Sequence, residues 1–206
     1  MSDARDRRFV EWAVAERPAA GEAESGDRAV VVVSDGAALM AAIDGLGHGR
    51  DAARAADSAV EVLRSFADES LGLLLARCHA ALRGSRGAAL SLARLRAPHK
   101  TVSWIGIGNV EGRLVRTDGA GAVSVESLMP ARGIAGSRLA ESQEATLPIY
   151  RGDLVLLATD GIDPAFADSL RTYGTAEEIA ARILADHSKS TDDALVVAVR
   201  YLGGNQ

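Results

Sequence analysis

The sequence contains a single cysteine, Cys78, and few histidines. One chain can therefore build neither an internal disulfide nor a zinc site made of several cysteines. Cys78 lies on the apolar stripe of a predicted helix, so we expect a core thiol and not a nucleophile. His79, His99 and His187 show no spacing typical of metal ligands.

Basic residues are outnumbered by acidic ones, and long hydrophobic runs are missing. Lys and Arg total 23 against 28 Asp and Glu, a formal net charge of -5, which disfavours binding to nucleic acid or to an anionic membrane. No stretch approaches the roughly 20 apolar residues of a membrane span, and the N-terminal MSDARDRRF has no apolar leader. We therefore expect a cytoplasmic protein with no nucleic-acid or membrane partner.

Aromatic residues make up only 4% of the chain and prolines number 5, but hydrophobic residues reach 48% and charged residues 25%. These values are typical of an ordinary globular protein and exclude collagen-like and disordered classes. No internal repeat or linker interrupts the sequence. We predict one domain over residues 1–206.

Strand-like and helix-like patterns alternate along the chain in blocks. Period-two alternation near the N-terminus predicts a strand, and we expect Trp12, like Trp104, to pack within a sheet. Apolar steps of three and four begin at Ala52 and continue through two consecutive helices. A capping box of Thr175 and Glu178 marks another helix start. The expected strands are 9–15, 29–33, 39–43, 88–95, 101–108, 113–117, 122–128, 154–158 and 195–201, and helices are expected at 52–66, 71–82, 164–170 and from 175.

Runs of adjacent strands broken by helix pairs favour antiparallel sheets over a doubly wound parallel sheet. The order of elements therefore predicts an α+β fold, a four-layer αββα sandwich of two antiparallel sheets flanked by helix pairs.

Aspartates stand where strands end or turns begin in four short motifs. These motifs are Gly26-Asp27, Asp44-Gly45, Asp160-Gly161 and Asp192-Asp193. Strand ends of a sandwich can meet at one rim, where crowded carboxylates repel one another unless cations neutralise them. Mg²⁺ and Mn²⁺ prefer such oxygen ligands, and a pair of ions roughly 4 Å apart can activate a water and bind a phosphoryl group. The pattern points to phosphate-ester hydrolysis.

The alternative interpretation of these motifs is structural, because Asp-Gly is also a common turn dipeptide. Asp44 differs from a simple turn residue because it precedes Gly45, Gly47 and Gly49 at the start of a helix, where the backbone can approach an ion closely. Asp160 follows five apolar residues that would anchor it at a strand end. Spacing alone leaves the two-metal site and a set of turns equally open.

Taken in order, the motifs resemble a known family. The segments are Gly26-Asp27, the run DGLGHG from Asp44, the run GDLVLLATDG from Gly152, and Asp192-Asp193. Together they are similar to the metal-dependent serine/threonine phosphatases of type 2C (the PPM family), and within it to the bacterial SpoIIE-like branch. The chain length and the run WIGIGNVE from Trp104 resemble the stressosome phosphatases of that branch most. The likeness spans residues 22–199.

This resemblance implies both a fold and a ligand set. The family has an αββα sandwich and uses two Mn²⁺ or Mg²⁺ ions. By position, Asp44 would bridge both ions and the Gly45 carbonyl would bind beside it. Asp27 would serve one ion, and Asp160 and Asp192 would hold the other. Asp193 is the weaker ligand candidate of its pair, and no covalent phospho-enzyme is needed.

Three departures from the family pattern concern residues around the ions. In eukaryotic members a histidine directly follows the Asp-Gly pair, but this chain has Leu46 at that position. His48 lies two residues later and is our candidate proton donor, with helix capping or packing as its alternative role. Leu195 stands where the last motif often has a hydroxyl residue, which predicts a lost hydrogen bond near the metal. Arg17 is the nearest candidate for a phosphate-binding arginine, with a solvated loop charge as the alternative.

The implied activity is hydrolysis of phosphoserine or phosphothreonine on a partner protein, with STAS-domain stressosome components of a general stress response as the expected substrates. Dephosphorylation of a free anti-anti-sigma factor is a second possibility. A GHKL-type nucleotide-binding module is an alternative from another class, because its Asp-x-Gly-x-Gly box superficially matches the run from Asp44 to Gly47. A catalytically inactive scaffold has no support, since all four key aspartates are present.

Overall fold

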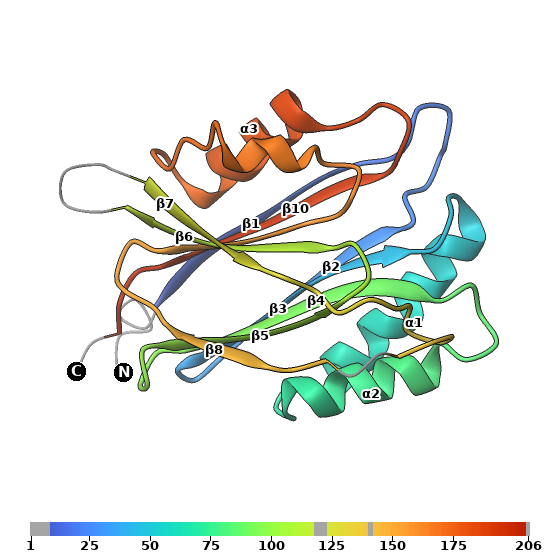
Figure 1. Cartoon of the computed structure of the whole chain (residues 1–206), viewed down its shortest axis with the longest axis horizontal. Helices are drawn as coiled ribbons and strands as arrows, with labels where there is room; N and C mark the ends of the chain where they lie inside the picture. The colour runs from blue at the N-terminus through green and yellow to red at the C-terminus, as the bar shows by residue number, and fades with distance from the viewer. Residues whose placement is uncertain (1–8, 118–122, 140–141, 205–206) are drawn as a thin grey trace, which may run out of the picture.

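The computed structural model describes residues 9–117, 123–139 and 142–204, and it contains two antiparallel five-stranded sheets packed face to face (Figure 1). One sheet has the order β1-β10-β9-β6-β7 and the other has the order β2-β3-β4-β5-β8. The strands are β1 (Val10–Arg17), β2 (Asp27–Ser34), β3 (Ala37–Gly45), β4 (Ala88–Arg96), β5 (Thr101–Ile107), β6 (Glu111–Thr117), β7 (Val123–Leu128), β8 (Ala145–Pro148), β9 (Leu154–Ala158) and β10 (Ala194–Tyr201).

Helices cover the outer face of each sheet (Figure 1). Two α-helices, α1 (Arg50–Ser65) and α2 (Leu71–Ala81), cover the sheet that contains β3. The other sheet is covered by the 3-10 helix η1 (Pro164–Ala167) and by α3 (Ala176–His187). The predicted α+β sandwich is confirmed. Its second helix pair differs from the expectation, because the segment expected as a helix over 164–170 forms only the short η1.

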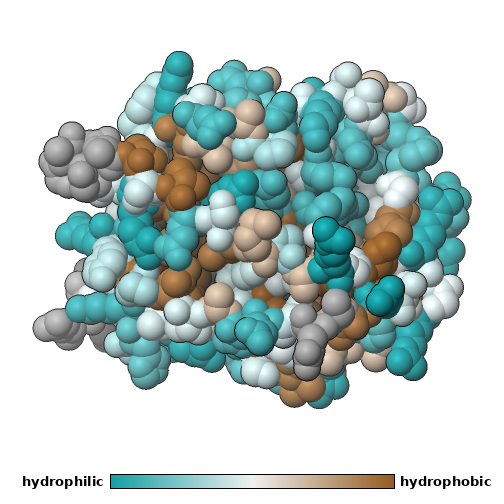
Figure 2. All heavy atoms as spheres, in the orientation of Figure 1, coloured by the Kyte–Doolittle hydropathy of each residue, from teal (hydrophilic) through white to brown (hydrophobic). Residues whose placement is uncertain are grey.

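Apolar side chains fill three layers. The layer between the sheets includes Met40, Leu114 and Val197. A second layer joins α1 and α2 to their sheet, and a third joins α3 and η1 to the other sheet. Cys78 lies in the second layer as the sequence predicts, where burial raises the pKa of its thiol to about 12. The space-filling view shows hydrophilic residues over much of one face, with hydrophobic residues in separate patches (Figure 2).

One expectation about the sheets was wrong, and one strand was not predicted. Trp104 is buried, but Trp12 on β1 is 48% exposed. Its partner in the sheet, Val199, is buried between the sheets, so Trp12 faces inward. Trp12 remains accessible because β1 is an edge strand and β2 packs across from β10. The strand β8 was not predicted, since four residues ending in Pro148 give too little periodicity for a prediction.

The capping box at the start of α3 is present as predicted. The Glu178 backbone N–H donates to the Thr175 hydroxyl at 3.1 Å, and the Thr175 N–H donates to the Glu178 carboxylate at 2.8 Å.

Within the described ranges, no helix has both the length and the apolar character needed to cross a membrane.

Candidate metal centre

Asp27 and Asp44 lie opposite each other on neighbouring strands. Asp27 is the first residue of β2, and Asp44 is its register partner near the end of β3. Antiparallel pairing therefore places both carboxylates at the same end of one sheet. Gly45 follows at the end of β3, where a Cβ would lie 2.2 Å from the Ala52 carbonyl oxygen. Only glycine lets α1 begin this close to the strand end.

Asp160 and Asp192 come from the other sheet. Asp160 stands two residues after β9, and Asp192 stands two residues before β10, which pairs with β9. The intervening Gly161 approaches the next segment so closely that a Cβ would lie 1.8 Å from the Asp193 carbonyl oxygen. This contact brings the segment after β9 against the segment before β10.

The two pairs of carboxylates meet across the sandwich. The negative charge of Asp160 raises the pKa of both Asp27 and Asp44, and that of Asp192 raises the pKa of Asp44 and Asp160. The structure therefore brings the four predicted aspartates into one acidic rim. In the described parts of the chain, however, no three His, Cys, Asp or Glu side chains are grouped tightly enough to hold an ion in this conformation.

Burial and mutual repulsion perturb these acids strongly. Burial, followed by the negative charge of Asp44, raises the pKa of Asp27 from 3.8 to about 8. Burial, followed by the charges of Asp160 and Asp192, raises the pKa of Asp44 from 3.8 to about 7. The pKa of Asp160 is also raised, mainly by burial. Carboxylate oxygens are the ligands that a hard divalent cation prefers, and the charge of such an ion would offset this repulsion.

Three side chains that sequence reasoning did not single out hold the acids in place. The Thr159 hydroxyl donates to Asp27 Oδ2 at 2.7 Å and accepts from the Leu195 N–H at 2.9 Å. The Asn109 amide donates to Asp160 Oδ2 at 2.6 Å. The Lys189 ammonium donates to the Asp160 carbonyl at 2.6 Å. Thr159 thus supplies a hydroxyl next to Asp27, while the loss of a side-chain hydrogen bond at Leu195 stays a prediction.

Asp193 has a different environment from Asp192. It is only 3% exposed, and its two carboxylate oxygens accept from the backbone N–H groups of Ala19 and Gly26, each at 2.7 Å. Both oxygens therefore fasten the loop between β1 and β2. This arrangement agrees with assigning the ligand role to Asp192.

His48 lies in the segment between β3 and α1, four residues after Asp44. Its side chain is 71% exposed, and its Nδ1 lies 2.7 Å from Glu22 Oε1. The pairing at Nδ1 leaves Nε2 as the nitrogen that can face a substrate. Arg17, the candidate for phosphate binding, donates instead to the Lys189 carbonyl at 3.0 Å.

The fold is that of PP2C-type serine/threonine phosphatase domains. A family model described as "Stage II sporulation protein E (SpoIIE)" matches residues 34–203, and the chain belongs to this family. The expected alternative of a GHKL-type module was wrong, because the β2-β3 hairpin and the two-sheet sandwich belong to the phosphatase fold.

Individual relatives agree with this assignment. The phosphoserine phosphatase RsbX of Bacillus subtilis (strain 168) is 23% identical over 160 residues, covering 77% of this chain and 78% of RsbX. A crystal structure of RsbX in complex with magnesium has a TM-score of 0.83 at 21% identity, covering 94% of this chain and 96% of that chain.

Two further solved structures show the same fold. One, reported for "The bacterial stressosome: a modular system that has been adapted to control secondary messenger signaling", has a TM-score of 0.84 at 29% identity and covers 93% of this chain and 99% of that chain. The other is the serine/threonine protein phosphatase PstP in complex with two manganese ions, with a TM-score of 0.66 at 17% identity and coverage of 93% and 97%.

Proposed function

We propose that this chain, acting as one domain over residues 1–206, hydrolyses phosphoserine or phosphothreonine on a partner protein. The observation that carries the proposal is the meeting of Asp27 and Asp44 with Asp160 and Asp192 across the sandwich. The four residues come from two sheets; Asp27 is buried and the other three are partly buried, and a packing role would not require four carboxylates at one rim.

Two Mg²⁺ or Mn²⁺ ions bound here would supply an activated water and would offset the charge that develops on the phosphoryl oxygens. The carboxylates of Asp27, Asp44, Asp160 and Asp192 and the Gly45 carbonyl would hold them. RsbX binds magnesium and PstP binds manganese in their crystal structures, which supports this choice of ions. Because like charges repel, we expect the carboxylates to move closer together when cations bind.

The remaining residues act on the acids and on the leaving group. Thr159 and Asn109 orient the carboxylates of Asp27 and Asp160 through hydrogen bonds. His48, whose Nδ1 is held by Glu22, would donate a proton from Nε2 to the departing serine or threonine oxygen. We assign His48 this proton-donor role within the proposal.

STAS-domain proteins of a stressosome are the proposed substrates. The support is the similarity to RsbX, a phosphoserine phosphatase, and to a structure reported for the bacterial stressosome. A free anti-anti-sigma factor is the second candidate substrate, and it uses the same chemistry.

The test is hydrolysis of p-nitrophenyl phosphate with Mn²⁺, with excess chelator, and by Asp44→Asn. We expect turnover that requires the metal and is lost in the variant. Asp68→Asn is the matched control, since Asp68 is an exposed loop residue between α1 and α2. Turnover that survives chelator and Asp44→Asn would refute the metal assignment. Release of phosphate from a phosphorylated STAS-domain protein, compared with a phosphorylated anti-anti-sigma factor, then separates the two substrates.

A further inference from the structure

Two arginines hold residues 171–174 by their backbone carbonyls. Arg182 donates to the carbonyls of residues 171 and 173 at 3.2 and 3.3 Å. Arg200 donates to the carbonyls of residues 172 and 174 at 2.8 and 2.7 Å. Four consecutive carbonyls are therefore fixed by side chains from α3 and β10. A segment held in this way loses little conformational freedom when a partner binds.

This fixed segment displays two side chains of the types that dominate binding interfaces. Tyr173 is 66% exposed, and the Arg182 guanidinium lies 4.4 Å from the centre of its ring, which restrains it. Arg171 is exposed, and its guanidinium has no hydrogen-bond or ion-pair partner in the described parts of the chain. Tyrosine and arginine are enriched among residues that contribute most to protein binding.

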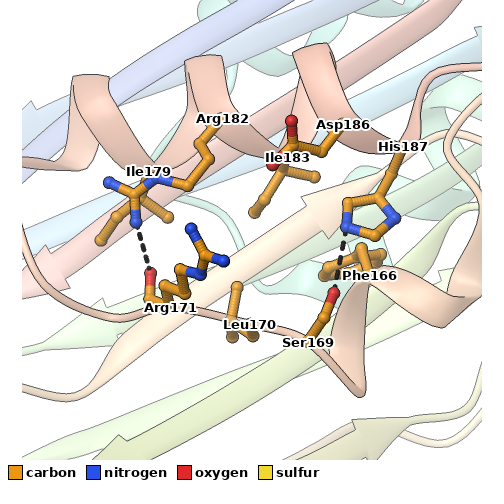
Figure 3. Close-up of a pocket in the computed structure, with 9 residues that line it drawn as sticks. All are labelled: Phe166, Ser169, Leu170, Arg171, Ile179, Arg182, Ile183, Asp186 and His187. Atoms are coloured by element: carbon orange, nitrogen blue, oxygen red, sulfur yellow. Dashed lines mark hydrogen bonds between the residues drawn. The ribbon is translucent and has the colours of Figure 1, made fainter.

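A cavity of about 60 Å³ lies next to this segment, between α3 and the chain that follows η1 (Figure 3). Apolar side chains line much of it, from Phe166, Leu170, Ile179 and Ile183. At one end the Ser169 hydroxyl and His187 Nε2 lie 3.2 Å apart. Figure 3 shows the Arg171 guanidinium directed into the space between its own segment and α3. The cavity has room for the end of one aliphatic side chain.

The charge around the cavity is opposite in sign to that of the whole chain. Arg171 and Arg182 line it against one carboxylate, from Asp186, while the Glu178 carboxylate lies beside Gly174 and accepts from the Thr175 N–H. The chain as a whole has a formal net charge of -5. A basic rim beside an apolar lining complements an acidic segment that also carries an apolar side chain.

The cavity lies close to the acidic rim. His187, which lines it, accepts a hydrogen bond at its carbonyl from the Asp163 N–H at 2.8 Å. Two residues further on, the Lys189 N–H donates to the Gly161 carbonyl at 2.7 Å. Because two residues span at most about 7 Å, the His187 backbone lies on the order of 10 Å from that of Gly161. Residues 171–174 lie farther from the rim, because Arg200, which holds them, stands six residues after Ala194, roughly 20 Å along β10. An extended peptide of about six to eight residues spans that distance.

We propose that the cavity and residues 171–174 form a docking site for an acidic segment of the phosphorylated partner protein. An aliphatic side chain of that segment enters the cavity, and a neighbouring carboxylate binds Arg171 while the segment packs on Tyr173. The identity of the partner as a substrate rests on the proposed function. The docking surface itself rests on the cavity, the fixed segment and the charge.

The kinetic test uses phosphoserine peptides that carry Glu-Leu-Glu at spacings of roughly four to eight residues on either side of the phosphoserine. Matched peptides carry Lys-Ser-Lys. At one or more spacings, we expect kcat/KM for the acidic peptide to exceed that of its matched peptide by about tenfold. Arg171→Glu should remove the difference and Tyr173→Ala should reduce it, with p-nitrophenyl phosphate turnover unchanged in both variants. Arg54→Glu, which reverses an exposed arginine on α1 in the opposite layer, should leave the difference intact.

A binding measurement separates this proposal from the proposed function. An unphosphorylated Glu-Leu-Glu peptide is titrated into the isotope-labelled protein, and amide resonances are followed by nuclear magnetic resonance. We expect shifts concentrated in residues 166–187 of the wild type and lost in Arg171→Glu, whether or not the protein hydrolyses phosphate. No shift there, or an acidic-peptide preference that survives Arg171→Glu, would overturn the docking site.

Discussion

The Thr159 hydroxyl donates a hydrogen bond of 2.7 Å to Asp27 Oδ2, although 132 positions separate the two residues in the sequence. Thr159 follows β9 in one sheet and Asp27 begins β2 in the other. This buried bond therefore joins the two sheets at the acidic rim. It also fixes one oxygen of a proposed metal ligand.

Replacing the Thr159 hydroxyl should weaken metal binding. Thr159→Val keeps the shape of the side chain but removes both the bond to Asp27 and the acceptor for the Leu195 N–H. We expect a loss in Mn²⁺ affinity of about 10- to 100-fold, measured by calorimetry, because partners of metal ligands usually contribute that much. Thr159→Ser retains the hydroxyl and should stay near the wild-type affinity. Equal affinity in the valine variant would show that the bond serves stability alone.

The metal-free protein should become less stable as the pH rises from about 4 to 8. In the folded state the pKa of Asp27 is raised to about 8 and that of Asp44 to about 7, both from 3.8. Between these values the folded protein binds more protons than the unfolded chain, so its free energy of unfolding falls as the pH increases. Urea denaturation with chelator at several pH values measures this slope. Asp27→Asn should flatten it, and an unchanged slope would contradict the assignment.

Substitution of Asp193 should lower the stability of the protein, whereas substitution of Asp192 should abolish its phosphatase activity. Asp193→Asn replaces an oxygen that accepts a backbone N–H by an amide donor, next to either Ala19 or Gly26. We expect the free energy of unfolding to fall by about 2–3 kcal/mol in denaturant titrations, since hydrogen bonds to charged groups contribute that much. Asp192→Asn should leave stability nearly unchanged while phosphatase activity is lost. The reverse pattern would mean that the ligand roles of the two residues are exchanged.

Glu22 and His48 should act as a pair. Their side chains lie 2.7 Å apart, and Glu22 holds the imidazole at Nδ1. We expect His48→Ala and Glu22→Gln each to lower kcat for a phosphopeptide, with the double variant no slower than His48→Ala. For p-nitrophenyl phosphate the effect should be smaller, because its leaving group needs less protonation. Full additivity of the two substitutions would show that the residues act separately.

Local sequence signals predicted most of the elements. Apolar steps of three and four predicted α1 and α2, and Thr175 with Glu178 predicted the start of α3. These patterns depend on neighbours within one turn of a helix, so the sequence displays them directly. The segment over 164–170 gave only η1, and β8 was not predicted, because short edge elements are stabilised by contacts with distant strands.

The site was predictable only in part. Each aspartate was visible as a residue at a strand end, and the order of the motifs identified the family. From the sequence, Asn109 was interpreted as a turn residue and Thr159 as part of a motif, since neither carries a charge that would single it out. Their roles depend on partners in other strands, and Asp193 shows its role only through Ala19 and Gly26.

The sequence by itself determined the class of fold, the acidic residue types and the order in which they occur, because these follow from local periodicity and from the chemistry of single side chains. The tertiary structure decided which carboxylate oxygens accept hydrogen bonds from neighbours, in which direction burial shifts the pKa of each carboxyl group, and where basic side chains meet an apolar cavity. Those properties arise from distances between residues far apart in the chain, which the packing of sheets, helices and loops sets.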